Sequence, residues 1–225
     1  MKVLINGIKK LLDYDSCNVH TVCIENKQFY QKTVWEIYKS VQGDSDVLKV
    51  YDKNEECNVT KDVFIINDLY NLNLNNTKTS NAILSHLKDR VNKTSLRDKC
   101  DALISSLTSF FDEVAEVSDY NVGWNNNIDI TQMLKLAGFH AEFTEEPEII
   151  YNVIKYIKVL YEILGVRLFV FINSKTIFDR DVLKVFYHQC SLEGYNILNV
   201  DVTLSSPVSE QENVVIIDRD FCEIY

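Results

Sequence analysis

Residues 167–173 (RLFVFIN) contain five consecutive apolar residues, and the segments before and after them have helical patterns. Apolar residues recur at spacings of three and four over residues 150–164, and a second helix is expected over residues 179–193. A continuous apolar run of this length is typical of a strand that is buried on both faces. A buried strand between two helices predicts a mostly parallel sheet that is covered by helices.

The same alternation of strands and helices extends in both directions from this segment. A helix begins after Asn26, whose side chain is suited to capping it, and ends at Gly43. Short strands are expected at residues 3–5, 20–24, 47–51, 63–66, 197–202 and 214–217. The predicted fold class is therefore α/β.

The middle of the chain has a different character, because two helical patterns follow each other there without a strand. The first begins at about Ser80 and the second near Ser95. The second helix has a seam of apolar residues at spacings of three and four, which needs a partner helix from this chain or another. The seam consists of Leu103, Ile104, Leu107, Phe110, Phe111, Val114 and Val117. We therefore expect a protruding helical hairpin.

The composition excludes several classes of protein. The 225 residues include 46% apolar residues, with 33 Asp and Glu against 23 Lys and Arg, which indicates a globular acidic protein. Its net charge of -10 argues against coating nucleic acid by bulk attraction. No run of about 18 apolar residues is present, so no membrane span is expected. The six scattered cysteines form no C-x-x-C pair, which predicts reduced thiols in a cytoplasmic protein and no zinc site.

Three of the predicted strands are followed by a polar residue, namely Asp68, Asn173 and Asp218. In a nucleotide-binding sheet, a carboxylate at this position can hold magnesium. That function also needs a glycine-rich phosphate loop ending in Lys and Ser or Thr, and the sequence contains none. We therefore predict no nucleotide hydrolysis and no catalytic residues.

Charge is segregated along the chain. Residues 112–148 contain nine acidic residues and one basic residue, Lys135, whereas residues 76–100 contain six basic and two acidic residues. The acidic segment offers oxygen ligands that suit calcium, but it has no EF-hand spacing, and on spacing alone a solvated acidic face is the favoured explanation. The basic segment has a charge suited to DNA phosphates, and ordinary solvated helix charge is the alternative. The candidate DNA-binding residues are Lys88, Arg90, Lys93, Arg97, Lys99 and Lys135.

The order of these features resembles the small CRISPR-associated adaptation protein of type II-A systems, the second member of the Csn group. The resemblance covers most of the chain and rests on pattern, spacing and length. The segments concerned are residues 21–29 (TVCIENKQF), 62–74 (DVFIINDLYNLNL), 128–142 (IDITQMLKLAGFHAE), 167–173 (RLFVFIN) and 214–220 (VVIIDRD).

The resemblance implies a head that is similar to P-loop nucleotide hydrolases (Rossmann-like) but lacks a working phosphate loop. It places the head at residues 1–79 and 119–225, and an extended α-helical leg at residues 80–118. It further implies a calcium-binding homotetrameric ring that binds double-stranded DNA, preferably at linear ends, without catalysis. The implied role is spacer acquisition in antiviral defence, with the CRISPR integrase proteins and the large effector nuclease as partners.

The resemblance also bears on the candidate metal ligands. Glu142 matches an acidic position associated with calcium in the family, and Glu116 and Asp119 fall in the acidic helix end that supplies other ligands. The full candidate set is Glu113, Glu116, Asp119, Asp129 and Glu142. Asparagines stand at 125–127 where further carboxylates are expected, which predicts weaker calcium binding.

Two other functions remain open at this point. One is a metal-dependent nuclease or phosphotransferase that uses Asp68, Asp218 or the acidic segment with magnesium. The other is a protein-only interaction module whose interface is the apolar seam. Cleavage of DNA would indicate the first, and an absence of salt-dependent DNA binding would indicate the second.

Overall fold

A computed structural model describes residues 1–142, 146–202 and 207–225 of the chain. The chain folds as two compact units. Met1–Leu72 together with Glu145–Tyr225 form the α/β unit, and Asn73–Thr144 form the helical unit. We describe each unit by itself.

A six-stranded sheet forms the centre of the α/β unit, and five of its strands are parallel. Only the edge strand β10 runs antiparallel, next to β9. The strand order is β10 (Glu223–Ile224), β9 (Glu212–Ile217), β3 (Val19–Ile24), β8 (Asn196–Asp201), β7 (Leu168–Ile172) and β6 (Val63–Ile66). The predicted α/β class with a mostly parallel sheet is confirmed.

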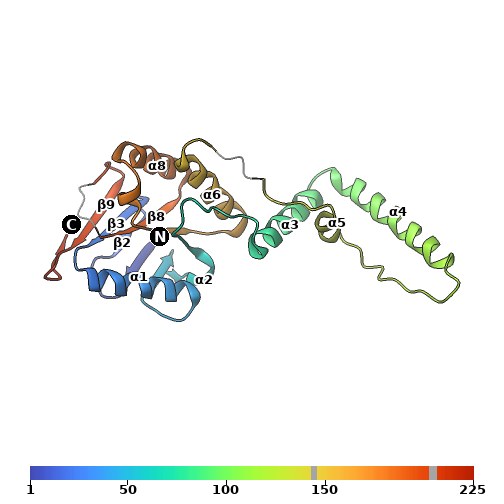
Figure 1. Ribbon diagram of the computed structural model, residues 1–225, viewed down its shortest axis with the longest axis horizontal. Helices are drawn as coiled ribbons and strands as arrows, with labels where there is room; N and C mark the ends of the chain where they lie inside the picture. The colour runs from blue at the N-terminus through green and yellow to red at the C-terminus, as the bar shows by residue number, and fades with distance from the viewer. Residues whose placement is uncertain (143–145, 203–206) are drawn as a thin grey trace. The chain divides into compact units, whose positions relative to one another are not determined.

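Helices cover both faces of this sheet (Figure 1). Helix α1 (Lys27–Gln42) lies on one face, and α6 (Ile149–Leu164) and α8 (Arg180–Glu193) lie on the other. Because side chains alternate along a strand, each strand contributes to both cores. Phe171 of β7, for example, points to α8, where its ring packs edge-on against Phe186 at 5.5 Å between centroids.

Two of the predicted strands do not join the parallel sheet. These two, β1 (Lys2–Ile5) and β4 (Leu48–Asp52), pair with each other in a second, antiparallel sheet. The two-residue strands β2 (Leu12–Asp13) and β5 (Glu55–Glu56) complete it, in the order β2, β1, β4, β5. In β1, Val3 and Ile5 are buried whereas the residues between and before them are exposed. This alternation is typical of an antiparallel strand with one face in the core, and it distinguishes β1 from β3, in which all six residues are buried.

The helical unit contains α3 (Thr77–Asn92), α4 (Leu96–Glu116) and α5 (Ile130–Leu136). The side chain of Asn76 accepts a hydrogen bond from the Thr79 amide at 2.9 Å and so begins α3. Helix α3 packs against both α4 and α5. The unit is therefore wider than the two helices of the predicted leg, because it includes α5 and the segment before it.

Two further helices of four residues each, α2 (Val59–Asp62) and α7 (Ser174–Ile177), belong to the α/β unit. Among the described residues, no helix has the length and apolar character that crossing a membrane requires.

Candidate functional site

The predicted DNA-binding residues are gathered around the turn between α3 and α4, apart from Lys135 on α5. Arg90 lies in the last turn of α3, Lys93 ends that helix, and Lys99 lies near the start of α4. These side chains are exposed, and so are Arg97 and Lys135. Only Arg97 among them is near a carboxylate of the described chain, that of Asp101 at 4.0 Å, an exposed pair that leaves the guanidinium accessible.

Lys88 differs from the other basic candidates because its ammonium is already paired. Its Nζ lies 2.9 Å from Oδ2 of Asp129, and both side chains are about half exposed. Asp129 also caps α5, where its carboxylate accepts a hydrogen bond from the Gln132 amide at 3.0 Å. The hydrogen bond from Lys88, followed by that from Gln132, lowers the pKa of Asp129. A predicted DNA contact and a predicted metal ligand are thus bound to each other, and they join α3 to α5.

The other candidate metal ligands are separate from Asp129. Glu113 and Glu116 lie in the last two turns of α4, and Asp119 and Glu142 lie outside regular structure, all of them exposed. Across residues 1–142, 146–202 and 207–225, no three His, Cys, Asp or Glu side chains gather in a group that could hold a metal ion. The five candidates do not form a calcium site within the described chain, and calcium binding stays a prediction.

Helix α4 presents a stripe of exposed apolar side chains, which we call the α4 stripe. At 3.6 residues per turn, its members fall within about 60° of one another around the helix. They are Leu96, Leu103, Phe110, Val114 and Val117, each at least 50% exposed. A different face of α4 is covered by its own unit, since Phe111 packs against Trp124 at 5.3 Å and Asp112 accepts a hydrogen bond from the indole of Trp124.

The sequence predicted that the apolar seam needs a partner helix. The structure separates the seam into two parts, because Ile104, Leu107 and Phe111 are partly buried whereas the α4 stripe is open. A stripe about 30 Å long of exposed apolar residues is unusual for a monomer and marks an interaction surface.

The connection from β3 to α1 is short and contains no glycine, whereas nucleotide hydrolases bind phosphate in a glycine-rich loop between a strand and a helix. In the present chain β3 ends at Ile24 and α1 begins at Lys27, so only Glu25 and Asn26 connect them. The Asn26 side chain accepts hydrogen bonds from the amides of Gln28 and Phe29 at 3.1 and 3.0 Å. The amides that would bind a phosphate at this helix end therefore already have a partner.

The carboxylates that follow the strands also have local partners. Asp68 accepts hydrogen bonds from the amides of Tyr70 and Asn71, and Asp218 accepts them from the amides of Asp220 and Cys222. Both side chains therefore stabilise turns. Asn173, the third residue of this kind, adopts the left-handed conformation between β7 and α7.

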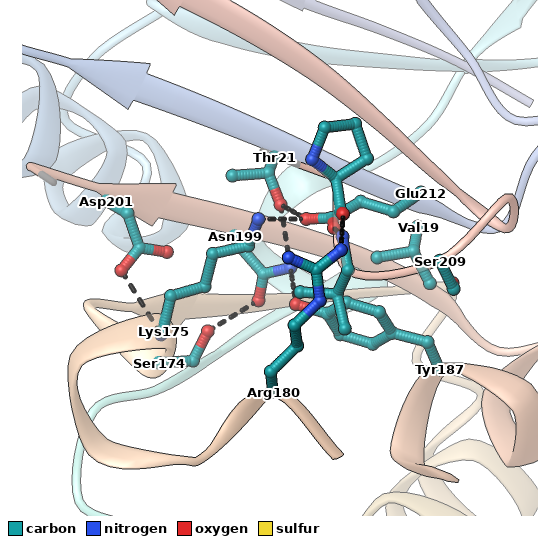
Figure 2. Close-up of polar contacts among 12 residues, drawn as sticks. Val19, Thr21, Ser174, Lys175, Arg180, Tyr187, Asn199, Asp201, Ser209 and Glu212 are labelled. Carbon is teal, nitrogen blue, oxygen red and sulfur yellow. Dashed lines mark hydrogen bonds and ion pairs between the residues drawn. The ribbon is translucent and has the colours of Figure 1, made fainter. Parts of the chain in front are cut away.

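A buried polar network lies between the sheet and α8, and the sequence analysis did not identify it (Figure 2). At its centre, Asn199 of β8 donates hydrogen bonds to Thr21 of β3 and Tyr187 of α8 at 3.1 and 3.0 Å. Its carbonyl oxygen accepts a hydrogen bond from the Ser174 hydroxyl at 2.8 Å. Thr21 in turn donates to the carboxylate of Glu212, at the start of β9. One set of side chains thus joins the strands β3, β8 and β9 to the helices α7 and α8.

The network contains a buried ion pair between Lys175 and Glu212. The Lys175 Nζ lies 2.5 Å from Oε1 of Glu212, and the two side chains are 4% and 0% exposed. The other oxygen of Glu212 accepts a hydrogen bond from the Val208 amide at 2.6 Å. Asp201 lies nearby, where its Oδ1 accepts from the Lys175 amide, and burial raises the pKa of Asp201 to about 6. Burial, followed by the charge of Glu212, also raises the pKa of Tyr187. None of these residues stands in a motif, and only their positions in the fold show that they meet.

A family model described as CRISPR-associated protein (Cas_Csn2) matches residues 40–221, which is most of the chain and includes the whole helical unit. The chain belongs to this family. The resemblance noted from the sequence is thereby confirmed, and Csn2 membership assigns the chain to type II-A CRISPR systems with a role in adaptation. A search of curated proteins finds no match to the chain.

Proposed function

We propose that this Csn2 protein is a non-enzymatic, ring-shaped homotetramer that binds double-stranded DNA during spacer acquisition, preferably at linear ends. In this proposal it acts in the cytoplasm with the CRISPR integrase proteins and the large effector nuclease. The α/β unit is the head, related to P-loop nucleotide hydrolases without their phosphate loop, and the helical unit is the leg.

The observation that supports assembly most directly is the open α4 stripe. Leu103 and Phe110 at its centre are 50% and 56% exposed, and a second copy of the chain offers the same apolar surface. Pairing of identical faces gives a closed two-fold contact. Two such pairs, joined through a second surface of the chain, make a tetramer.

The observation that supports DNA binding is the set of exposed cations around the α3–α4 turn. Arg90, Lys93 and Lys99 have no carboxylate partner among the described residues. A single copy offers only a few phosphate contacts, but four copies around one duplex bind it multivalently. Because these contacts are made to the backbone, sequence is not read, and a closed ring must be threaded from an end.

The proposed lack of catalysis is supported by the chemistry of the sheet edge. The Asn26 side chain occupies the amides at the start of α1, and Asp68 and Asp218 are used in turns. In this proposal, calcium is bound by carboxylates from different copies of the chain, which assembly brings together. The five predicted ligands do not meet within the described part of one chain.

Removal of exposed cations tests the DNA interface. The double variant Lys93→Gln, Lys99→Gln is expected to bind linear duplex DNA more weakly. In a plot of log K against log salt concentration, the slope should become less negative by about one for each phosphate that the variant no longer neutralises. Fluorescence anisotropy at several salt concentrations measures both effects.

The matched control removes two lysines from the α/β unit, in Lys27→Gln, Lys32→Gln, where both side chains are also exposed. An equal loss of affinity in both double variants would show that net charge rather than the α3–α4 turn matters. An absence of salt-dependent DNA binding would contradict the proposal and favour a protein-only interaction module.

A further inference from the structure

The carboxylate of Glu223 in β10 is held by two successive backbone amides from the start of the chain. Its Oε1 accepts a hydrogen bond from the Lys9 amide at 2.6 Å, and its Oε2 accepts one from the Lys10 amide at 3.0 Å. Each carboxylate oxygen therefore has its own donor. Such charge-assisted bonds to paired amides are characteristic of anion-binding sites in proteins.

The two amides directly follow a tight turn and lie in a basic segment. Gly7 adopts φ +95°, a conformation that favours glycine, and a Cβ there would lie 3.4 Å from the ring of Phe29. The turn is closed by a hydrogen bond from the Ile8 amide to the Ile5 carbonyl at 2.9 Å. Residues 1–12 contain three lysines and no acidic residue, so the Lys9–Lys10 amide pair lies in a basic segment.

The hairpin that supplies Glu223 is short, and its turn is closed by Asp218, which accepts hydrogen bonds from the amides of Asp220 and Cys222. β10 pairs with β9 over two residues only. Phe221 adopts a left-handed φ of 61° and packs edge-on against Phe29 at 5.5 Å. The side chains that end the hairpin remain open, since Ile224 is 53% and Tyr225 72% exposed. The bonds to Glu223 therefore join this short hairpin to the start of the chain.

The turn and the hairpin lie at the carboxyl ends of β3 and β9. The Glu25 amide, directly after β3, donates to the Ile217 carbonyl at the end of β9, and the hairpin turn follows from there. Ligands of open α/β sheets bind at this edge. At the start of α1 the amides are capped by the adjacent Asn26, whereas the Lys9–Lys10 amide pair is capped by a side chain from a hairpin distant in the sequence.

We propose that the Lys9–Lys10 amide pair is a binding site for a phosphate group, and that Glu223 is a built-in competitor that keeps it closed. A tethered carboxylate competes at an effective concentration of about millimolar, so a weak phosphate ligand is excluded until the hairpin opens. When Glu223 leaves, the amides and the ammonium of Lys10, which now lies 4.5 Å from the centre of the Tyr225 ring, are available to the phosphate.

The phosphate is either free in solution or part of a DNA backbone. Only the second source rests on the DNA binding proposed above, and two ligands distinguish the sources. Isothermal titration calorimetry with inorganic phosphate probes the first, and anisotropy with a linear duplex probes the second.

The test compares Glu223→Ala with Asp220→Ala, which removes an exposed carboxylate from the same hairpin turn. Glu223→Ala is expected to bind inorganic phosphate, or the duplex, at least about tenfold more tightly than the wild type, because the competitor is gone. Asp220→Ala should bind as the wild type does. Hydrogen exchange over residues 7–11 should become faster in Glu223→Ala alone. Adding Lys10→Gln should reduce the gain in affinity, because the ammonium is removed while the two backbone amides remain.

The proposal is overturned if Glu223→Ala binds both ligands no better than the wild type does, or if Asp220→Ala gains as much. Tighter binding of phosphate alone would support the site and identify its ligand as a free anion. Failure of the wild type to bind DNA would contradict the proposed function, but it would leave the result with inorganic phosphate unaffected.

Discussion

Leu103→Asp together with Phe110→Asp is expected to convert the assembly into smaller species and to abolish DNA binding by the ring. Both side chains lie at the centre of the α4 stripe and are at least half exposed in the single chain. Full burial of such a side chain stabilises an interface by about 1.5–3 kcal/mol. Each copy in a symmetric contact buries two of these side chains, Leu103 and Phe110. Association should therefore weaken by about a thousandfold or more.

Sedimentation velocity at several protein concentrations measures this change. Leu192→Asp is the matched control, because Leu192 is 69% exposed on α8 and lies outside the α4 stripe. Circular dichroism should show that all variants are folded, since neither Leu103 nor Phe110 is part of a core. An unchanged sedimentation coefficient in the α4 double variant would show that the stripe is not the contact between copies.

Lys175→Met is expected to destabilise the α/β unit by about 3–5 kcal/mol, because it leaves the buried carboxylate of Glu212 without its ion-pair partner. The hydrogen bonds from Thr21 and Val208 to Glu212 remain, but they do not balance its charge. Adding Glu212→Gln removes that charge and should restore much of the stability.

The destabilisation should depend on pH through Asp201. Burial raises its pKa to about 6 from the usual 3.8, so the folded state holds this proton more tightly than the unfolded chain does. The cost of ionising Asp201 is absent below pH 3.8 and is fully present once the pH has risen through 6. Because Lys175 offsets part of that cost, Lys175→Met should be more destabilising at about pH 8 than at about pH 5.

Urea unfolding of each variant gives these free energies. Lys88→Met provides the comparison, because it makes the same substitution in the half-exposed pair with Asp129 and should cost about 1 kcal/mol or less. Equal destabilisation by Lys175→Met and Lys88→Met would mean that the buried pair has no special importance for the α/β unit.

Much of the α/β unit could be predicted from the sequence because its signals are local. The continuous apolar run at β7, the cap at Asn26 and the apolar spacing of α6 each follow from residues close together in the chain. The separate antiparallel sheet was missed, since the pairing of β1 with β4 joins residues more than 40 positions apart. The two-residue strands β2, β5 and β10 are too short to give a pattern.

The candidate sites were less predictable because they depend on side chains that meet only in the folded chain. The exposed apolar side of α4 follows from its spacing, but which half of the seam stays open depends on Trp124, which covers Phe111. Lys88 and Asp129 are 41 positions apart and form an ion pair, so a predicted DNA contact and a predicted metal ligand are partners of each other. Glu223 and the Lys9–Lys10 amide pair come from opposite ends of the chain, and no local pattern indicates that they meet.

The most direct test of a DNA-threading ring is sedimentation of the purified protein with linear and with circular duplex DNA of the same sequence. The proposed ring predicts a tetramer that shifts the linear duplex, releases it as salt increases, and leaves the closed circle unshifted. A monomer that binds neither DNA molecule would contradict the threading ring. So would a protein that changes the sedimentation of the linear and the circular duplex equally.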